Sequence, residues 1–209
     1  MVSMTGMPRP ASGAIGGPSV MQEVSALENE RKLRLAARSN DIERLSSLLL
    51  GGTNVNASDG IGMTALMLAA ACGYSKCCRL LCGCGASVEA KDKAVGNTAL
   101  MLAARSGQTA VVELLLNFGA HVEATNVNGW TPFVHAVYGG HGSTNLEEPC
   151  CMKLLQKAGS DIEVKTRLSE TAMDWALRNH RAEARKLLES WLSATARVAR
   201  KTRTDAAGG

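Results

Sequence analysis

The chain has 209 residues with a formal net charge of +4; 45% of the residues are apolar and 3% are aromatic. A chain of this length can hold one domain or two, and the shortage of aromatic side chains suits a core of Leu, Ala, Val and Cys between thin helices. Because no run of about 18 apolar residues occurs, we predict no membrane-spanning helix.

The N-terminal segment, residues 1–26, is predicted to be a flexible tail. Its first 22 residues are rich in Gly, Pro, Ser and Met and contain no acid before Glu23, which is typical of chain without fixed structure. The segment lacks the basic start and apolar stretch of a secretory signal. Its only cation is Arg9, which disfavours the alternative of a mitochondrial transit peptide.

A unit of two short apolar helices then recurs through residues 27–192. Its most regular copy begins at Thr98, a residue type that caps helix N-termini, and the first helix of that copy is predicted to end at Gly107. The same opening occurs at Thr64 and at Thr131, so the unit recurs with a period of about 33 residues, which indicates a stacked array. Stacking follows because two short helices bury their apolar faces only when the next copy covers them.

About five units follow one another, with approximate bounds at 28–59, 60–92, 93–126, 127–166 and 167–192. The first unit has charged residues in place of the opening threonine motif, and the last interleaves arginines with its apolar face. Both are predicted to be degenerate caps, because terminal repeats need a polar outer face.

Two segments depart from the regular spacing. The step from Thr131 to Thr171 is longer than the steps between the earlier threonines, so we predict an insertion at residues 142–149. An insertion in an array is either a functional loop or one that the fold merely tolerates, and the sequence leaves both readings open.

Residues 193–209 carry four cations against one acid and are predicted to be a flexible basic tail.

Five of the seven cysteines fall within the second unit, 60–92. Thiolates are good zinc ligands, but the unit has no CxxC…CxxC framework, and Cys77 and Cys78 take the places of Val111 and Val112 in the next unit. Cysteine at such positions behaves as a small buried hydrophobe. We therefore expect structural packing, with no metal site and no cofactor. Crowded thiols of this kind also indicate a reducing intracellular compartment, the cytoplasm or the nucleus.

The units resemble the ankyrin repeat, whose usual pattern is G-x-T-P-L-H-x-A-A…G-H…V-V-x-L-L-L…G-A-x-V-N-A. The segment Gly129-Trp130-Thr131-Pro132-Phe133 is similar to the opening, and G-A-H-V-E-A at 119–124 is similar to the close. The resemblance implies an all-α ankyrin-repeat solenoid of helix-turn-helix repeats with β-turn fingers. It also implies the absence of the hydrogen bonds that the family's histidine makes between turns, since that position holds Met67, Met101, Val134 and Asp174.

The resemblance further implies a concave binding surface built from the fingers and the first helices. Variable positions on it lie just before the opening threonine and just after the alanine pair. Trp, Tyr and Arg are favoured in binding hot spots, and Trp130 and Tyr138 occur within one unit. We expect partner-binding residues at Met63, Asn97, Arg105, Trp130, Tyr138, Glu170 and Arg178. The alternative is that Trp130 only covers a neighbouring finger.

Catalysis is not expected from this sequence. The four histidines fall at different repeat positions, and no Gly-rich phosphate loop follows a predicted strand. His135 takes the place of Leu68 and Leu102, so we expect a core histidine rather than a base.

The expected function is protein–protein interaction, as an adaptor, scaffold or regulatory module for a protein or peptide with an acidic segment. The module itself would be monomeric or part of a larger complex. The alternative is attachment to nucleic acid or an anionic membrane through the basic tail. Nucleic acid is the less favoured partner, because the tail has no interleaved aromatics to stack on bases.

Overall fold

The computed structural model describes residues 20–139 and 150–207, with side chains of the last stretch up to residue 197. In this part of the chain all regular secondary structure is helical, apart from one isolated antiparallel bridge between Ser58 and Thr64. The helices are α1 (Val20–Ser39), α2 (Ile42–Leu50), α3 (Ala65–Cys72), α4 (Ser75–Gly83), α5 (Ala99–Arg105), α6 (Thr109–Asn117), α7 (Pro132–Tyr138), α8 (Cys150–Lys157), α9 (Ala172–Arg178) and α10 (Ala182–Ala207).

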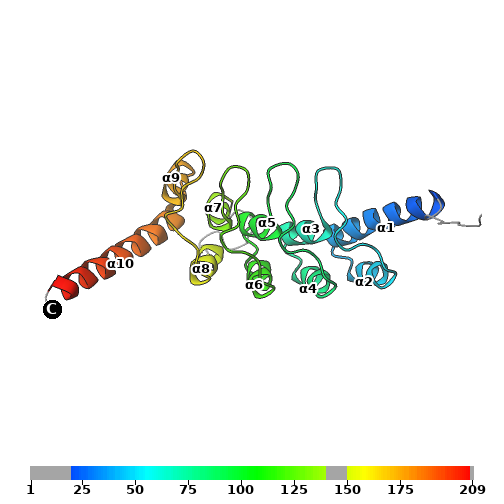
Figure 1. Cartoon of the computed structure of the whole chain (residues 1–209), viewed down its shortest axis with the longest axis horizontal. Helices are drawn as coiled ribbons and strands as arrows, with labels where there is room; N and C mark the ends of the chain where they lie inside the picture. Colours follow the sequence, from blue (N-terminus) through cyan, green and yellow to red (C-terminus); the bar gives the residue numbers. More distant parts are fainter. Residues whose placement is uncertain (1–19, 140–149, 208–209) are drawn as a thin grey trace, which may run out of the picture.

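The helices form two layers in an elongated array (Figure 1). Helices α1, α3, α5, α7 and α9 pack in sequence as an inner row, and α2, α4, α6 and α8 pack as an outer row. Loops between successive repeats project from the inner row as fingers (Figure 1). The predicted all-α solenoid of helix-turn-helix repeats is therefore confirmed.

Each inner helix after the first begins at a threonine cap, as the spacing of these residues predicts. The hydroxyl oxygens of Thr64, Thr98, Thr131 and Thr171 accept hydrogen bonds from backbone N–H groups three residues later, at 3.3–3.4 Å. Each bond satisfies a donor that the helix itself leaves unpaired. The recurring threonine thus sets where each repeat starts.

The turn after the last inner helix has the left-handed geometry of the turns after α3 and α5, but without their glycine. Gly73 and Gly107 have φ values of 79° and 69° in the turns after α3 and α5. His180 occupies the matching place after α9 with a φ of 53°. Left-handed backbone is uncommon for residues other than glycine, so this turn differs from those after α3 and α5 in residue type rather than in shape.

Neighbouring fingers are joined by hydrogen bonds that replace those expected from the family's histidine. Asp92 and Asn126 are buried in successive fingers and accept bonds from the backbone of their own turns. The Asn126 amide also donates to the side-chain oxygen of Asn97 at 2.9 Å. Backbone bonds from Lys93 to Ile61 and from Val127 to Val95 add further links. The fingers therefore form a continuous hydrogen-bonded row.

The predicted flexible tails differ from the structure at residues 20–26 and 193–207, whereas their residues 1–19 and 208–209 lie outside the described chain. Helix α1 already begins at Val20, inside the predicted N-terminal tail, and α10 runs through the predicted basic tail to Ala207. Neither helical stretch contains Gly or Pro, and both are rich in Ala, Leu, Arg, Lys and Glu, which have high helix propensity. The predicted insertion at 142–149 lies outside the described residues.

The cysteines of the second repeat divide into buried and exposed groups. Cys77, Cys78 and Cys82 are core residues, and burial raises the pKa of Cys78 to about 12 and that of Cys82 to about 11. Cys72 and Cys84 are exposed, so the packing interpretation holds for three of the five. No group of His, Cys, Asp or Glu side chains in the described chain is arranged to hold a metal ion.

Candidate partner-binding surface

Three aromatic rings from two repeats meet on the inner-helix side of the array. Trp130 comes from the finger that leads into α7, Tyr138 from the end of α7 and Trp175 from α9. The ring centroid of Trp130 lies 5.1 Å from that of Tyr138 and 4.7 Å from that of Trp175, and the centroids of Tyr138 and Trp175 are 5.5 Å apart. All three contacts are edge-to-face, an arrangement that aromatic pairs prefer. These residues, all half-buried, are called the aromatic cluster below.

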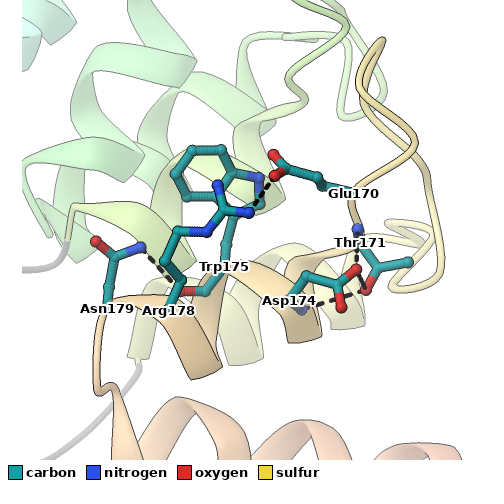
Figure 2. A network of polar contacts seen from close by, with 6 residues as sticks. All are labelled: Glu170, Thr171, Asp174, Trp175, Arg178 and Asn179. Carbon is teal, nitrogen blue, oxygen red and sulfur yellow. Dashed lines mark hydrogen bonds and ion pairs between the residues drawn. The ribbon is translucent and has the colours of Figure 1, made fainter.

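Two arginines lie over the rings of this cluster. The Arg105 guanidinium is 5.6 Å from the Tyr138 ring centroid, and the Arg178 guanidinium is 5.2 Å from that of Trp175. Both distances fit cation–π attraction. Arg178 also forms an ion pair with Glu170, and Figure 2 shows the Glu170 carboxylate facing the guanidinium beside the indole ring. Arg105 is exposed and therefore presents a cation to solvent.

The helix that carries Trp175 and Arg178 is held at both ends. At its start, the Asp174 carboxylate accepts from the Thr171 backbone and hydroxyl at 2.7 Å, while the Thr171 hydroxyl accepts from the Asp174 backbone (Figure 2). These bonds lower the pKa of Asp174. At its end, the Asn179 amide donates to the Trp175 carbonyl at 2.8 Å. The reciprocal caps explain how so short a helix keeps these two side chains oriented.

A groove of about 540 Å³ opens beside the aromatic cluster at the ends of the inner helices. Its walls are polar and small residues from successive repeats together with one cation and one aromatic ring. They are Ala71, Arg105, Ser106, Gln108, Tyr138, Gly139 and Asn179. The groove thus combines a guanidinium with hydroxyl and amide groups, which suits an anionic or strongly polar group of a ligand.

His135 lies buried beneath the aromatic cluster. The side chain is 2% exposed, and its ring centroid is 5.2 Å from that of Trp130. Burial, with a smaller contribution from the nearby Arg105 charge, lowers the pKa of His135 to about 4. The imidazole is therefore neutral near pH 7, as expected for a core histidine.

Several polar atoms near the aromatic cluster are buried without a hydrogen-bond partner among the described residues. They are the Glu170 Oε2, the Trp175 Nε1 and the His135 Nδ1 atoms. Buried polar atoms are usually paired. The two atoms of Glu170 and Trp175 belong to half-buried residues at this surface.

Five of the seven predicted site residues come together here, and two do not. Arg105, Trp130, Tyr138, Glu170 and Arg178 form the aromatic cluster and its charged edge. Asn97 is 5% exposed because its side chain is bonded to Asn126, so it is not part of the surface. Met63 packs against the core in an earlier repeat.

Sequence reasoning missed Trp175 and the polar lining of the groove. Trp175 falls at the same repeat position as Leu68, Leu102 and His135, which suggested a core residue. A large aromatic at that position in the last repeat was the available signal. Ser106, Gln108 and Asn179 follow the inner helices in the turns and carry no distinguishing pattern.

Stacked helix-turn-helix repeats with a side-chain cluster on the inner-helix side define a solenoid repeat protein. Residues 33–126 match the family model described as ankyrin repeats in three copies, and the repeats after them continue the same packing. Residues 33–126 of the chain are therefore ankyrin repeats. Ankyrin repeats generally mediate protein–protein interactions and are typically non-catalytic. A comparison with curated protein sequences gives no match.

None of the described helices is both long enough and apolar enough to cross a membrane.

Proposed function

We propose that this protein is a non-catalytic interaction module that binds a partner protein or peptide over the aromatic cluster and the adjoining groove. It would serve as an adaptor, scaffold or regulatory subunit in the cytoplasm or nucleus. The observation that carries the proposal is the convergence of Trp130, Tyr138 and Trp175 beneath Arg105. Aromatic and arginine side chains dominate the energy of protein interfaces when they cluster in this way.

The charge of the surface favours an acidic segment in the partner. Glu170 neutralises Arg178, whereas Arg105 is exposed at the edge of the polar groove. A carboxylate that enters the groove would meet the Arg105 guanidinium, and charge-assisted hydrogen bonds of this kind are about twice as strong as neutral ones. The aromatic cluster would bind an apolar side chain next to that carboxylate.

The test is selection of binders from a displayed random peptide library on the purified full chain. We expect enrichment of peptides with Asp or Glu beside an apolar residue. Arg105→Glu should weaken their binding about tenfold or more, because loss of a charge-assisted contact costs about 1.5–3 kcal/mol. Arg79→Glu on the outer helix α4 is the matched control, since Arg79 is also exposed. Selected peptides without acidic residues, or peptides that bind both variants equally, would contradict the proposal.

Deletion of residues 193–209 separates this proposal from the alternative of a basic attachment segment. Peptide binding at the aromatic cluster should survive the deletion unchanged. Binding that instead disappears with the deletion and falls steeply with added salt would favour attachment to an anionic polymer or membrane through this segment.

A further inference from the structure

Helix α1 exposes a row of large apolar side chains that no part of the described chain covers. Val20, Val24 and Leu27 are 75%, 56% and 65% exposed, and Leu35 is 46% exposed. At about 100° per residue these four residues share one side of the helix, on which the exposed Arg31 lies between Leu27 and Leu35. The buried residues Leu33, Ala36 and Ala37 point to the opposite side. We call the four exposed residues the α1 stripe.

The N-terminal part of α1 extends beyond the first repeat. Residues 20–28 are all exposed, and the blue end of α1 projects away from the rest of the array (Figure 1). A helical segment of this length is marginal in water when it has nothing to pack on. An apolar row on such a segment therefore favours a partner that covers it.

The charges of α1 indicate which partner fits. Residues 20–30 contain Glu23, Glu28 and Glu30 and no Lys or Arg, whereas residues 31–39 contain Arg31, Lys32, Arg34 and Arg38 and no Asp or Glu. A second α1 laid antiparallel places its acidic half along the basic half of the first. Parallel pairing would place like charges together, which is unfavourable, and would align the helix dipoles in the same direction.

We propose that two copies of this chain associate through an antiparallel pair of α1 helices. A two-fold axis between residues 27 and 28 brings the Leu27 side chains of both copies together and places Val20 opposite the partner's Leu35. On the same axis Glu23 lies at the level of the partner's Lys32 and on the same flank of the pair as the partner's Arg34. Such a contact is self-complementary and closed, as a two-fold interface requires. It involves the first repeat and does not rest on the function proposed for the aromatic cluster.

Sedimentation equilibrium of the full chain over a wide range of concentrations tests this proposal. The wild type should pass from 22.0 kDa to twice that mass as its concentration rises, and added salt should weaken the association. Val24→Glu with Leu27→Glu should raise the dissociation constant about a hundredfold or more, since each replaced apolar contact is worth at least about 1.4 kcal/mol, a factor of ten. Leu50→Glu is the matched control, because Leu50 is 90% exposed on α2, outside the stripe.

Charge reversal tests the antiparallel arrangement. The Glu23→Lys, Glu28→Lys variant and the Arg31→Glu, Lys32→Glu variant should each remain monomeric alone and should form a heterodimer when mixed. All of these residues are exposed or half-buried, and circular dichroism verifies that the variants keep their helices. The proposal is overturned by a wild type that stays at 22.0 kDa, by a dimer that survives the stripe variant, or by mixed charge variants that remain monomers.

Discussion

Gly139 lies so close to Arg105 that a Cβ atom on Gly139 would be 1.8 Å from the Arg105 carbonyl oxygen. The Arg181 guanidinium donates to the Gly139 carbonyl at 2.7 Å and holds the end of α7 in this place. Tyr138, the residue before, is thereby set beneath the Arg105 guanidinium. A close backbone contact between two repeats thus positions the cation and the ring of the candidate binding surface.

Replacement of Gly139 by alanine should destabilise the array. The backbone φ of Gly139 is −80° and its ψ is −92°; this φ is open to alanine, so the main expected cost is the contact with Arg105. Overpacking of this kind costs about 1–3 kcal/mol, measurable as a lower urea midpoint. Gly83→Ala in α4 is the control, because no atom lies within 4 Å of its Cβ position. Equal midpoints for the two variants would show that the contact is easily relieved.

His135 should make the folded state less stable in weak acid. An unfolded histidine has a pKa of about 6.5, whereas that of His135 in the fold is about 4. Between these values the unfolded chain binds a proton that the folded chain does not bind. The free energy of unfolding therefore falls as pH decreases from about 6.5 toward 4, by at most about 3 kcal/mol.

The His135→Leu variant isolates this contribution. Leucine occupies the same repeat position at Leu68 and Leu102, so the fold should accept it. Urea midpoints measured at neutral pH and near pH 5 should differ less in the variant than in the wild type. An unchanged pH dependence would mean that other groups account for the acid sensitivity.

Asn126 should contribute to stability and to the position of Trp130. Its side-chain oxygen accepts from the backbone of Asn128 and Trp130 at 2.9 and 3.0 Å, and its amide donates to Asn97. Asn126→Ala removes these bonds, together with the 3.4 Å contact between the Asn126 amide and His135 Nε2, at a buried site. We expect a loss of about 2–4 kcal/mol and altered near-ultraviolet dichroism from the tryptophan. Asn128→Ala, at an exposed side chain, should have little effect. Similar losses in both variants would contradict this role.

The thiols should react at widely different rates. Cys72 and Cys84 are exposed, whereas Cys77, Cys78, Cys82 and Cys151 are buried, and burial raises the pKa of each buried thiol. Because the thiolate is the reactive form, a disulfide reagent at mildly alkaline pH should label the two exposed thiols quickly and the four buried ones only on unfolding. The Cys72→Ser, Cys84→Ser variant should lose the fast phase. Its persistence would indicate that the half-buried Cys150 or one of the buried thiols reacts with the reagent.

The repeated unit was predictable because its determinants are local. Each threonine caps the helix that follows it, and each turn glycine supplies a left-handed backbone angle close to the helix that it ends. The regular recurrence of the unit then requires stacking. Residues 20–26 and 193–207 are helical rather than flexible, because the Gly- and Pro-rich composition ends before Val20 and neither stretch contains a helix-breaking residue.

The candidate surface was predictable only in part. Alignment of the repeats predicted five surface residues at variable positions that do lie together in the structure. They are Arg105, Trp130, Tyr138, Glu170 and Arg178. The same argument failed for Asn97, whose side chain is turned inward by a hydrogen bond to Asn126 in the next finger. The position of a residue within the repeat does not by itself distinguish a side chain that faces solvent from one that is hydrogen-bonded to a neighbouring repeat.

The sequence by itself determined the ankyrin repeats, their caps and the residue types available on the inner-helix side, since each follows from contacts within one unit or from its recurrence. Three contacts were decided only by the tertiary structure. The Trp175 ring packs against that of Trp130, Glu170 forms an ion pair with Arg178, and Gly139 at the end of α7 lies against the Arg105 backbone. Trp130–Trp175 and Gly139–Arg105 are contacts between different repeats, and Glu170–Arg178 joins a finger to the helix after it. Their geometry depends on how the elements pack, which no local pattern encodes.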